Sequence, residues 1–67
     1  MIVKEEIFTI LRKNYNLRKL MADEFDIREV TIYRWAGRKS QTKLSNEKVS
    51  VFIREKLNLS KEDYYKS

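Results

Sequence analysis

The side chains with recognisable chemistry gather between residues 28 and 34. They are two guanidinium groups, a carboxylate, a phenol and a branched aliphatic group: Arg28, Glu29, Val30, Tyr33 and Arg34. A guanidinium can donate two hydrogen bonds to guanine O6 and N7, a carboxylate can accept one from cytosine N4, and an aliphatic group can touch the thymine methyl. A tyrosine can contact a base or a phosphate. The segment therefore indicates recognition of base edges, although a core position suits Val30 equally well.

The positive charge of the chain is concentrated around this segment. Residues 12–43 contain nine Lys and Arg against four Asp and Glu, so their net charge of +5 equals that of the whole chain. Basic charge gathered in one region favours a polyanionic partner, and a solvated basic surface is the alternative. The side chains placed to contact a sugar-phosphate backbone are Arg18, Lys19, Arg38, Lys39, Thr42 and Lys43.

Catalysis and metal binding have few candidate groups in this sequence. Cysteine and histidine are absent, which removes thiolate chemistry, the usual general base and the commonest metal ligand. The acidic residues include adjacent pairs at positions 5–6, 23–24 and 62–63, and adjacent side chains on a helix point in different directions. We therefore expect neither an enzyme nor a metal site, a cofactor or a small-molecule ligand.

Composition and apolar spacing predict one all-α domain over residues 1–67. Proline is absent and glycine occurs once, which suits helices joined by short turns. Asn16 and Ser45 are expected to begin helices as N-caps, and Ser60 with Asp63 resembles a capping box. Residues 38–44 are expected to be a polar loop. The predicted helices cover about residues 3–15, 17–25, 28–36 and 45–57, followed by a short helix after Ser60.

The helix predicted over residues 17–25 has one apolar face. Arg18 and Lys19 are expected to point away from this face, towards solvent or a phosphate backbone. Ala22 is the small residue at which a second helix could cross closely. The apolar face itself consists of Leu17, Leu20, Met21 and Phe25.

The helix predicted over residues 28–36 follows a tight turn. Asp26 tolerates a left-handed backbone better than most residues, so it can occupy this corner, and Ile27 is expected to point inward. Ile32 and Trp35 are expected to bury one side of the helix. Gly37 is expected to end it as the residue after the C-cap.

Taken together, the central residues resemble the helix-turn-helix of the phage Cro and CI repressors, the lambda-repressor-like family. The run TIYRW is close to the usual core of the recognition helix, and FIREKLNLSKEDYY is similar to the closing helices of the family. Asp26 stands where the family usually has Gly, and Arg28 stands where it usually has Ser or Thr. The residues in the register of the family motif are Ala22, Phe25, Ile27, Thr31, Ile32, Arg34, Trp35 and Gly37.

The resemblance implies a compact four- to five-helix domain, with the motif at about residues 17–37, that binds double-stranded DNA sequence-specifically. Residues 28–36 would enter the major groove, and the protein would regulate transcription as a Cro-like repressor from a phage or mobile element. Such proteins often bind a palindromic operator as dimers. If this chain forms a homodimer, Phe52, Tyr64 and Tyr65 are candidates for the interface, and packing within a monomer explains them equally well.

Two other functions fit parts of the sequence. The run TIYRW also occurs in excisionase-like and MerR-like DNA-binding architectural factors, but these need a hairpin wing after the recognition helix. A helical module that binds and inhibits a partner protein is the other alternative, because a fold does not determine a function. No apolar run reaches the roughly 20 residues of a membrane span. We therefore expect a cytoplasmic, nucleoid-associated protein of a bacterial or phage-infected cell.

Overall fold

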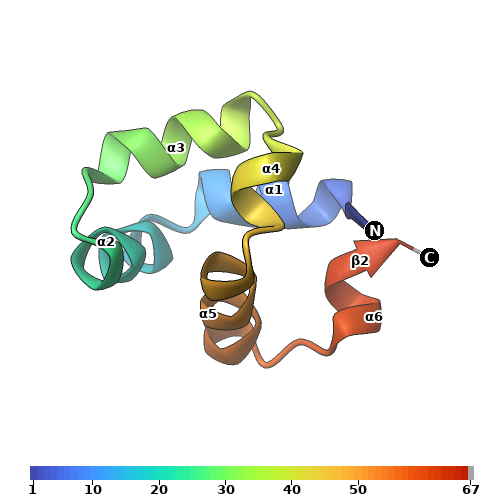
Figure 1. Ribbon diagram of the computed structural model, residues 1–67. Helices are drawn as coiled ribbons and strands as arrows, with labels where there is room; N and C mark the ends of the chain where they lie inside the picture. Colours follow the sequence, from blue (N-terminus) through green and yellow to red (C-terminus); the bar gives the residue numbers. More distant parts are fainter. Residues whose placement is uncertain (67) are drawn as a thin grey trace.

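The computed structural model describes residues 1–66, which form six helices and two short strands (Figure 1). The strands contribute only two residues each, so the predicted helical class is confirmed. Helix α4 replaces part of the loop that was predicted over residues 38–44. In chain order the elements are β1 (Ile2–Val3), α1 (Glu5–Lys13), α2 (Tyr15–Phe25), α3 (Glu29–Gly37), α4 (Gln41–Leu44), α5 (Glu47–Leu57), α6 (Lys61–Tyr64) and β2 (Tyr65–Lys66).

Helices α2 and α3 form the expected pair joined by a tight corner. Asp26 adopts the left-handed conformation, with φ of 53° and ψ of 49°, as its residue type predicted. Ile27 packs against the core, and its N–H donates to the Ala22 carbonyl at 3.1 Å. Helix α3 packs on both α1 and α2, and it lies along one side of the molecule, opposite α5 and α6 (Figure 1).

Each of three helices is followed, within two residues of its end, by a residue with a left-handed backbone, and none of these residues is glycine. The residues are Asp26 after α2, Lys39 after α3 and Asn58 after α5, with φ between 52° and 56°. After each of them, the next backbone N–H donates to the carbonyl five positions earlier, which is the bond of the Schellman motif. The prediction that Gly37 ends α3 in this conformation is wrong. Gly37 is the last helical residue, its φ is not positive, and Lys39 makes the reversal two residues later.

Two of the predicted N-caps are shifted along the chain. Asn14, not Asn16, caps α2 by accepting a hydrogen bond from the Leu17 N–H at 3.0 Å. Asn46, not Ser45, caps α5 through its side-chain oxygen. Both shifts follow from where the helices begin, at Tyr15 and Glu47, because the N-cap is the residue directly before the first helical residue. The predicted capping box of Ser60 and Asp63 at α6 is confirmed.

The sequence pattern did not predict a sheet, but the two ends of the chain pair. Strands β1 and β2 are antiparallel, with Val3 opposite Tyr65, and the termini lie side by side (Figure 1). The outer edge of β1 is closed by Gln41 of α4. Its side-chain oxygen accepts from the Val3 N–H at 2.7 Å, and its amide nitrogen donates to the Val3 carbonyl at 3.1 Å. A side-chain amide thus takes the place of a third strand and protects a free edge.

One apolar core holds all the helices together. Tyr64 is fully buried, and its hydroxyl donates to the Leu44 carbonyl at 2.7 Å. The expected burial of Leu20 is wrong, since its side chain is 49% exposed. Trp35 is partly buried, at the edge of the core. The buried hydrophobic residues are Val3, Ile7, Phe8, Leu11, Leu17, Met21, Ile32, Ala36, Leu44, Val49, Ile53 and Tyr64.

Candidate nucleic-acid interface

Helix α3 presents a continuous exposed stripe to solvent. Val30, Tyr33, Arg34 and Gly37 are all exposed, and their spacing of three, four and seven positions places them on one side of an α-helix. Tyr33 is 47% exposed and Val30 is 38% exposed, so the core alternative for Val30 is wrong. The opposite side of α3 carries the buried Ile32 and Ala36, and it fixes the helix to the rest of the domain.

Arg28 stands at the entrance of α3. Its backbone is extended, with φ of −82° and ψ of 143°, and its side chain forms no capping hydrogen bond to the helix. The side chain is exposed. The first turn of α3 therefore lacks the side-chain cap that Ser or Thr would supply. The guanidinium of Arg28 remains accessible to solvent at the N-terminal end of α3.

The sequence predicted that Arg18 would be an exposed cation, but its side chain is buried where α1, α2 and α3 meet. Its Nη1 donates to the carbonyls of Leu11 and Arg12 at the C-terminal end of α1, the first at 2.8 Å. Its Nε donates to the Glu29 carboxylate in the first turn of α3. The guanidinium thus satisfies two terminal carbonyls of α1 and holds α3 against them from α2. Because only 8% of the residue is exposed, Arg18 is not available to a phosphate backbone.

The same guanidinium also lies near two aromatic rings. Its central carbon is 5.0 Å from the centroid of the Tyr33 ring and 5.6 Å from that of the Tyr15 ring. These distances are within the range of cation–π attraction. Tyr33 therefore contacts the guanidinium of Arg18 through its ring, while nearly half of its surface faces solvent.

Glu29 belongs to this junction more than to the exposed stripe. Its side chain is 29% exposed, and its Oε2 accepts the hydrogen bond from Arg18. A carboxylate engaged in this way contributes to the position of α3, and its second oxygen remains as a possible acceptor. The base-reading role expected for Glu29 is thus restricted to one oxygen at the rim of the stripe.

The other expected backbone contacts are exposed, but three of them have partners. Lys39 Nζ lies 3.0 Å from Glu5 Oε2 in an exposed ion pair with α1. Lys43 Nζ lies 5.7 Å from the centroid of the Trp35 ring. Lys19 Nζ lies 5.8 Å from the centroid of the Tyr15 ring. Arg38 and Thr42 are exposed. Within residues 1–66, Arg34 and Arg38 form no ion pair, so both keep their charge for an external anion.

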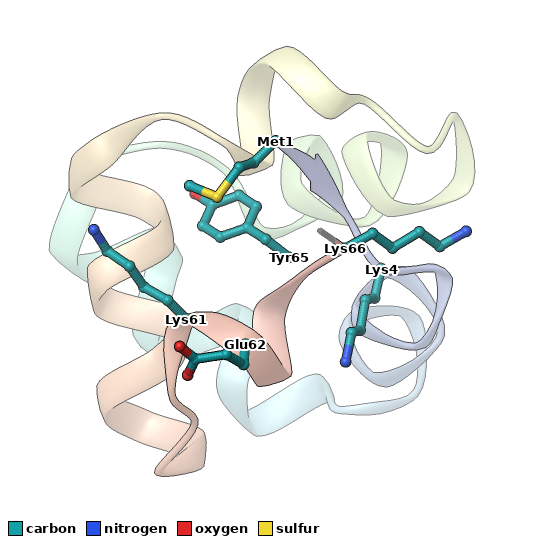
Figure 2. Close-up of a pocket in the computed structure, with 6 residues that line it drawn as sticks. All are labelled: Met1, Lys4, Lys61, Glu62, Tyr65 and Lys66. Atoms are coloured by element: carbon teal, nitrogen blue, oxygen red, sulfur yellow. The ribbon is translucent and has the colours of Figure 1, made fainter.

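The other surfaces of residues 1–66 gather fewer side chains suited to binding a ligand. The depression next to the termini is lined by Lys4, Lys61 and Lys66, but these side chains point away from one another (Figure 2). Residues 1–66 contain no group of three acidic, histidine or cysteine side chains that could hold a metal ion. No helix in this part of the chain has both the length and the apolarity needed to cross a bilayer.

The shifted pKa values lie at the other end of the molecule. Hydrogen bonds from the backbone and side chain of Ser60 lower the pKa of the Asp63 carboxyl. Burial, reinforced by the neighbouring Tyr65, raises the pKa of the Tyr64 hydroxyl well above its ordinary value. Asp63 closes the capping box at the start of α6, Tyr64 ties α6 to the carbonyl of Leu44, and neither group adjoins the stripe on α3.

Comparison with known proteins adds no relative to this description. No family model, curated protein or solved structure matches the chain.

The structure assembles most, but not all, of the predicted site. It brings Val30, Tyr33 and Arg34 to one exposed side of α3, leaves Arg28 exposed at the start of the helix, and buries Arg18. The signal for Arg18 was present in the helical periodicity. With 3.6 residues per turn, Arg18 falls between Phe25 and Ala22 on the buried side of α2, whereas Leu20 falls outside that side.

Proposed function

We propose that this chain is a sequence-specific double-stranded DNA-binding protein of the lambda-repressor-like helix-turn-helix type, acting as a Cro-like transcriptional repressor of a phage or mobile element. The observation that carries the proposal is the exposed stripe of α3. It presents Tyr33 and Arg34 to solvent, while the opposite side of the helix is buried in the core. An α-helix of this kind fits the major groove of B-DNA.

The fixed orientation of α3 supports this function. Base recognition requires that donors and acceptors meet the edges of bases in one register, so the helix must not rotate about its axis. Ile32 and Ala36 anchor α3 in the core, and the pairing of Glu29 with Arg18 anchors its first turn. The side chains on the outer face then have a defined direction before any DNA arrives.

The positions of the charged side chains around α3 support base contacts for some of them and phosphate contacts for others. Arg34 lies in the middle of the stripe and suits the O6 and N7 edge of guanine, with Arg28 a second candidate at the helix entrance. Arg38 and Lys43 follow α3 and suit the phosphates that border the groove. Lys19, which is exposed on α2, would contact a DNA phosphate in place of the buried Arg18.

The alternatives fit the described fold less well. A winged architecture needs a hairpin after the recognition helix, whereas residues 41–44 form helix α4. Tyrosine and arginine are also common at protein interfaces, so the discriminating feature is charge: Arg34 and Arg38 form no ion pair within residues 1–66, which favours a polyanion. A partner with an acidic surface remains as an outcome of the experiment below.

The test is selection of binding sites from random duplex DNA, followed by titration of the recovered duplex by fluorescence anisotropy. We expect Arg34→Ala to weaken binding by about 1–3 kcal/mol and to relax the preference at one base pair. Arg38→Ala should weaken binding to all duplexes and reduce the slope of affinity against salt. Lys61→Ala, which removes the same charge from α6, is the matched control and should leave binding unchanged.

Two outcomes would reject the proposal. One is the absence of duplex binding by the wild-type chain at low salt. The other is equal binding by all three variants, since affinity would then follow net charge and not the face of α3. A recovered palindrome would in addition show that two copies bind together. Tyr64 would not belong to the dimer interface, because it is fully buried within one chain.

A further inference from the structure

Gly37 is the only glycine of the chain, and neither its backbone nor its packing requires glycine. Its φ is not positive, so any residue can adopt its conformation. A Cβ built at this position would meet no atom within 4 Å, so no neighbour inside the protein needs the space. Glycine in the middle of a helix costs about 0.5–1 kcal/mol relative to alanine, and at the last residue of α3 the cost is smaller but has the same sign. The structure therefore contains an unfavourable glycine without an internal reason.

The rest of the chain makes this placement more informative. The positions at which glycine would relieve a left-handed backbone are occupied by Asp26, Lys39 and Asn58. Glycine is thus absent from the three positions whose backbone favours it. It is present at an exposed helical position where a side chain would extend into solvent. What distinguishes this position is therefore its exposed surface, which something outside the protein can approach closely.

The surroundings of Gly37 identify the chemistry of that partner. Gly37 lies on the exposed stripe of α3, one position from Arg38 and three from Arg34. Both arginines are exposed and form no ion pair within residues 1–66. The two available guanidinium groups attract a polyanion and offset the partial negative charge of the C-terminal turn of α3, and the missing side chain lets that partner come close to the helix.

We propose that Gly37 is the point at which α3 touches the sugar-phosphate backbone of duplex DNA, and that its missing side chain sets the depth of the helix in the groove. This inference rests on the proposed function and adds a residue to it. Arg38 holds a neighbouring phosphate, and Gly37 lets the helix backbone approach until Tyr33 and Arg34 reach the bases. A side chain at residue 37 would keep the whole stripe at a greater distance.

The proposal predicts that stability and DNA affinity change in opposite directions. Gly37→Ala and Gly37→Gln should raise the Tm, because both introduced residues form helices better than glycine. Gly37→Ala should weaken binding of the selected duplex by about tenfold, equivalent to about 1.4 kcal/mol, and the longer Gln side chain should weaken it further. Binding to unrelated duplexes should weaken as well, because the contact is with the backbone and not with a base.

The control variant is Val51→Ile on α5, which adds one methylene group at a partly exposed position on another helix. It should leave DNA affinity unchanged. If the wild-type chain binds duplex DNA but Gly37→Ala and Gly37→Gln bind equally well, Gly37 has no role in the contact and the proposed function still stands. If the wild-type chain binds no duplex, the proposed function itself fails. A Gly37→Ala variant that loses both Tm and affinity would overturn the inference, since the glycine would then serve folding.

Discussion

The buried guanidinium of Arg18 provides the sharpest test of how the domain holds α3. We consider Arg18→Met, which keeps a long unbranched stem but removes every hydrogen-bond donor. The wild-type group donates to two terminal carbonyls of α1 and to the carboxylate of Glu29. Hydrogen bonds to charged groups contribute about 1.5–3 kcal/mol each, but Glu29 is partly exposed and regains water when its partner is lost.

The expected loss for Arg18→Met is therefore about 3 kcal/mol, below the sum of three such bonds and near the lower limit for breaking a buried ion pair. In a domain of this size, each kcal/mol lowers the Tm by about 4–8 °C, so the Tm should fall by more than about 10 °C. Lys19→Met is the matched control, because it removes the same charge from the next, exposed position of α2. It should change the free energy of unfolding by no more than about 0.5 kcal/mol.

Urea denaturation followed by circular dichroism measures both values, and a double-mutant cycle with Glu29→Gln isolates the pair. We expect a coupling energy of about 1–2 kcal/mol between Arg18 and Glu29. If Arg18→Met does not fold, Arg18→Lys keeps the charge without the planar donor geometry and should show an intermediate loss. Equal effects of Arg18→Met and Lys19→Met, or a coupling energy near zero, would refute the view that this arginine fixes α3 to α1.

The remaining predictions concern the C-terminal half. Tyr64→Phe leaves the buried Leu44 carbonyl without its donor and should lower the free energy of unfolding by about 1–2 kcal/mol in urea denaturation. Because the folded state raises the pKa of Tyr64, it retains the proton longer than the unfolded state, so stability should be fully present below about pH 10 and fall above it. A Tyr64→Phe variant with an unchanged alkaline Tm profile would contradict this assignment. Asn58→Gly should raise stability by up to about 1 kcal/mol, since it relieves a left-handed backbone after α5. A Tm that falls instead would mean that the Asn58 side chain contributes more than its backbone strain costs.

Features set by neighbouring residues could be predicted from the sequence. The capping box at Ser60 and the left-handed corner at Asp26 depend on residues within a few positions, and both were predicted correctly. The periodicity of α3 placed Ile32 inside and Arg34 outside. The shifts from Asn16 to Asn14 and from Ser45 to Asn46 show the limit of this reading, because several polar residues near a helix start can each serve as its cap.

The candidate site was predictable to the same extent. The exposed positions of α3 follow from helical periodicity, so Tyr33 and Arg34 could be named in advance. Arg18 and Glu29 could not be separated from the other charged residues by type, since a charge alone does not say whether it lies in solvent or in a buried pair. Helical periodicity places Arg18 on the buried side of α2, but its partners became clear only when the C-terminal carbonyls of α1 and the carboxylate of Glu29 appeared beside it.

By itself, the sequence determined the helical class, the α2–turn–α3 unit and the basic character of the region around it. Tertiary structure alone decided that Arg18 is a structural junction, that Gly37 lies bare on the exposed stripe, and that the chain ends pair as strands. The physical reason is the separation of the groups involved. Helix periodicity and capping join residues within about one turn. By contrast, the amide of Gln41 meets the backbone of Val3 across 38 positions, and Tyr64 reaches Leu44 across 20.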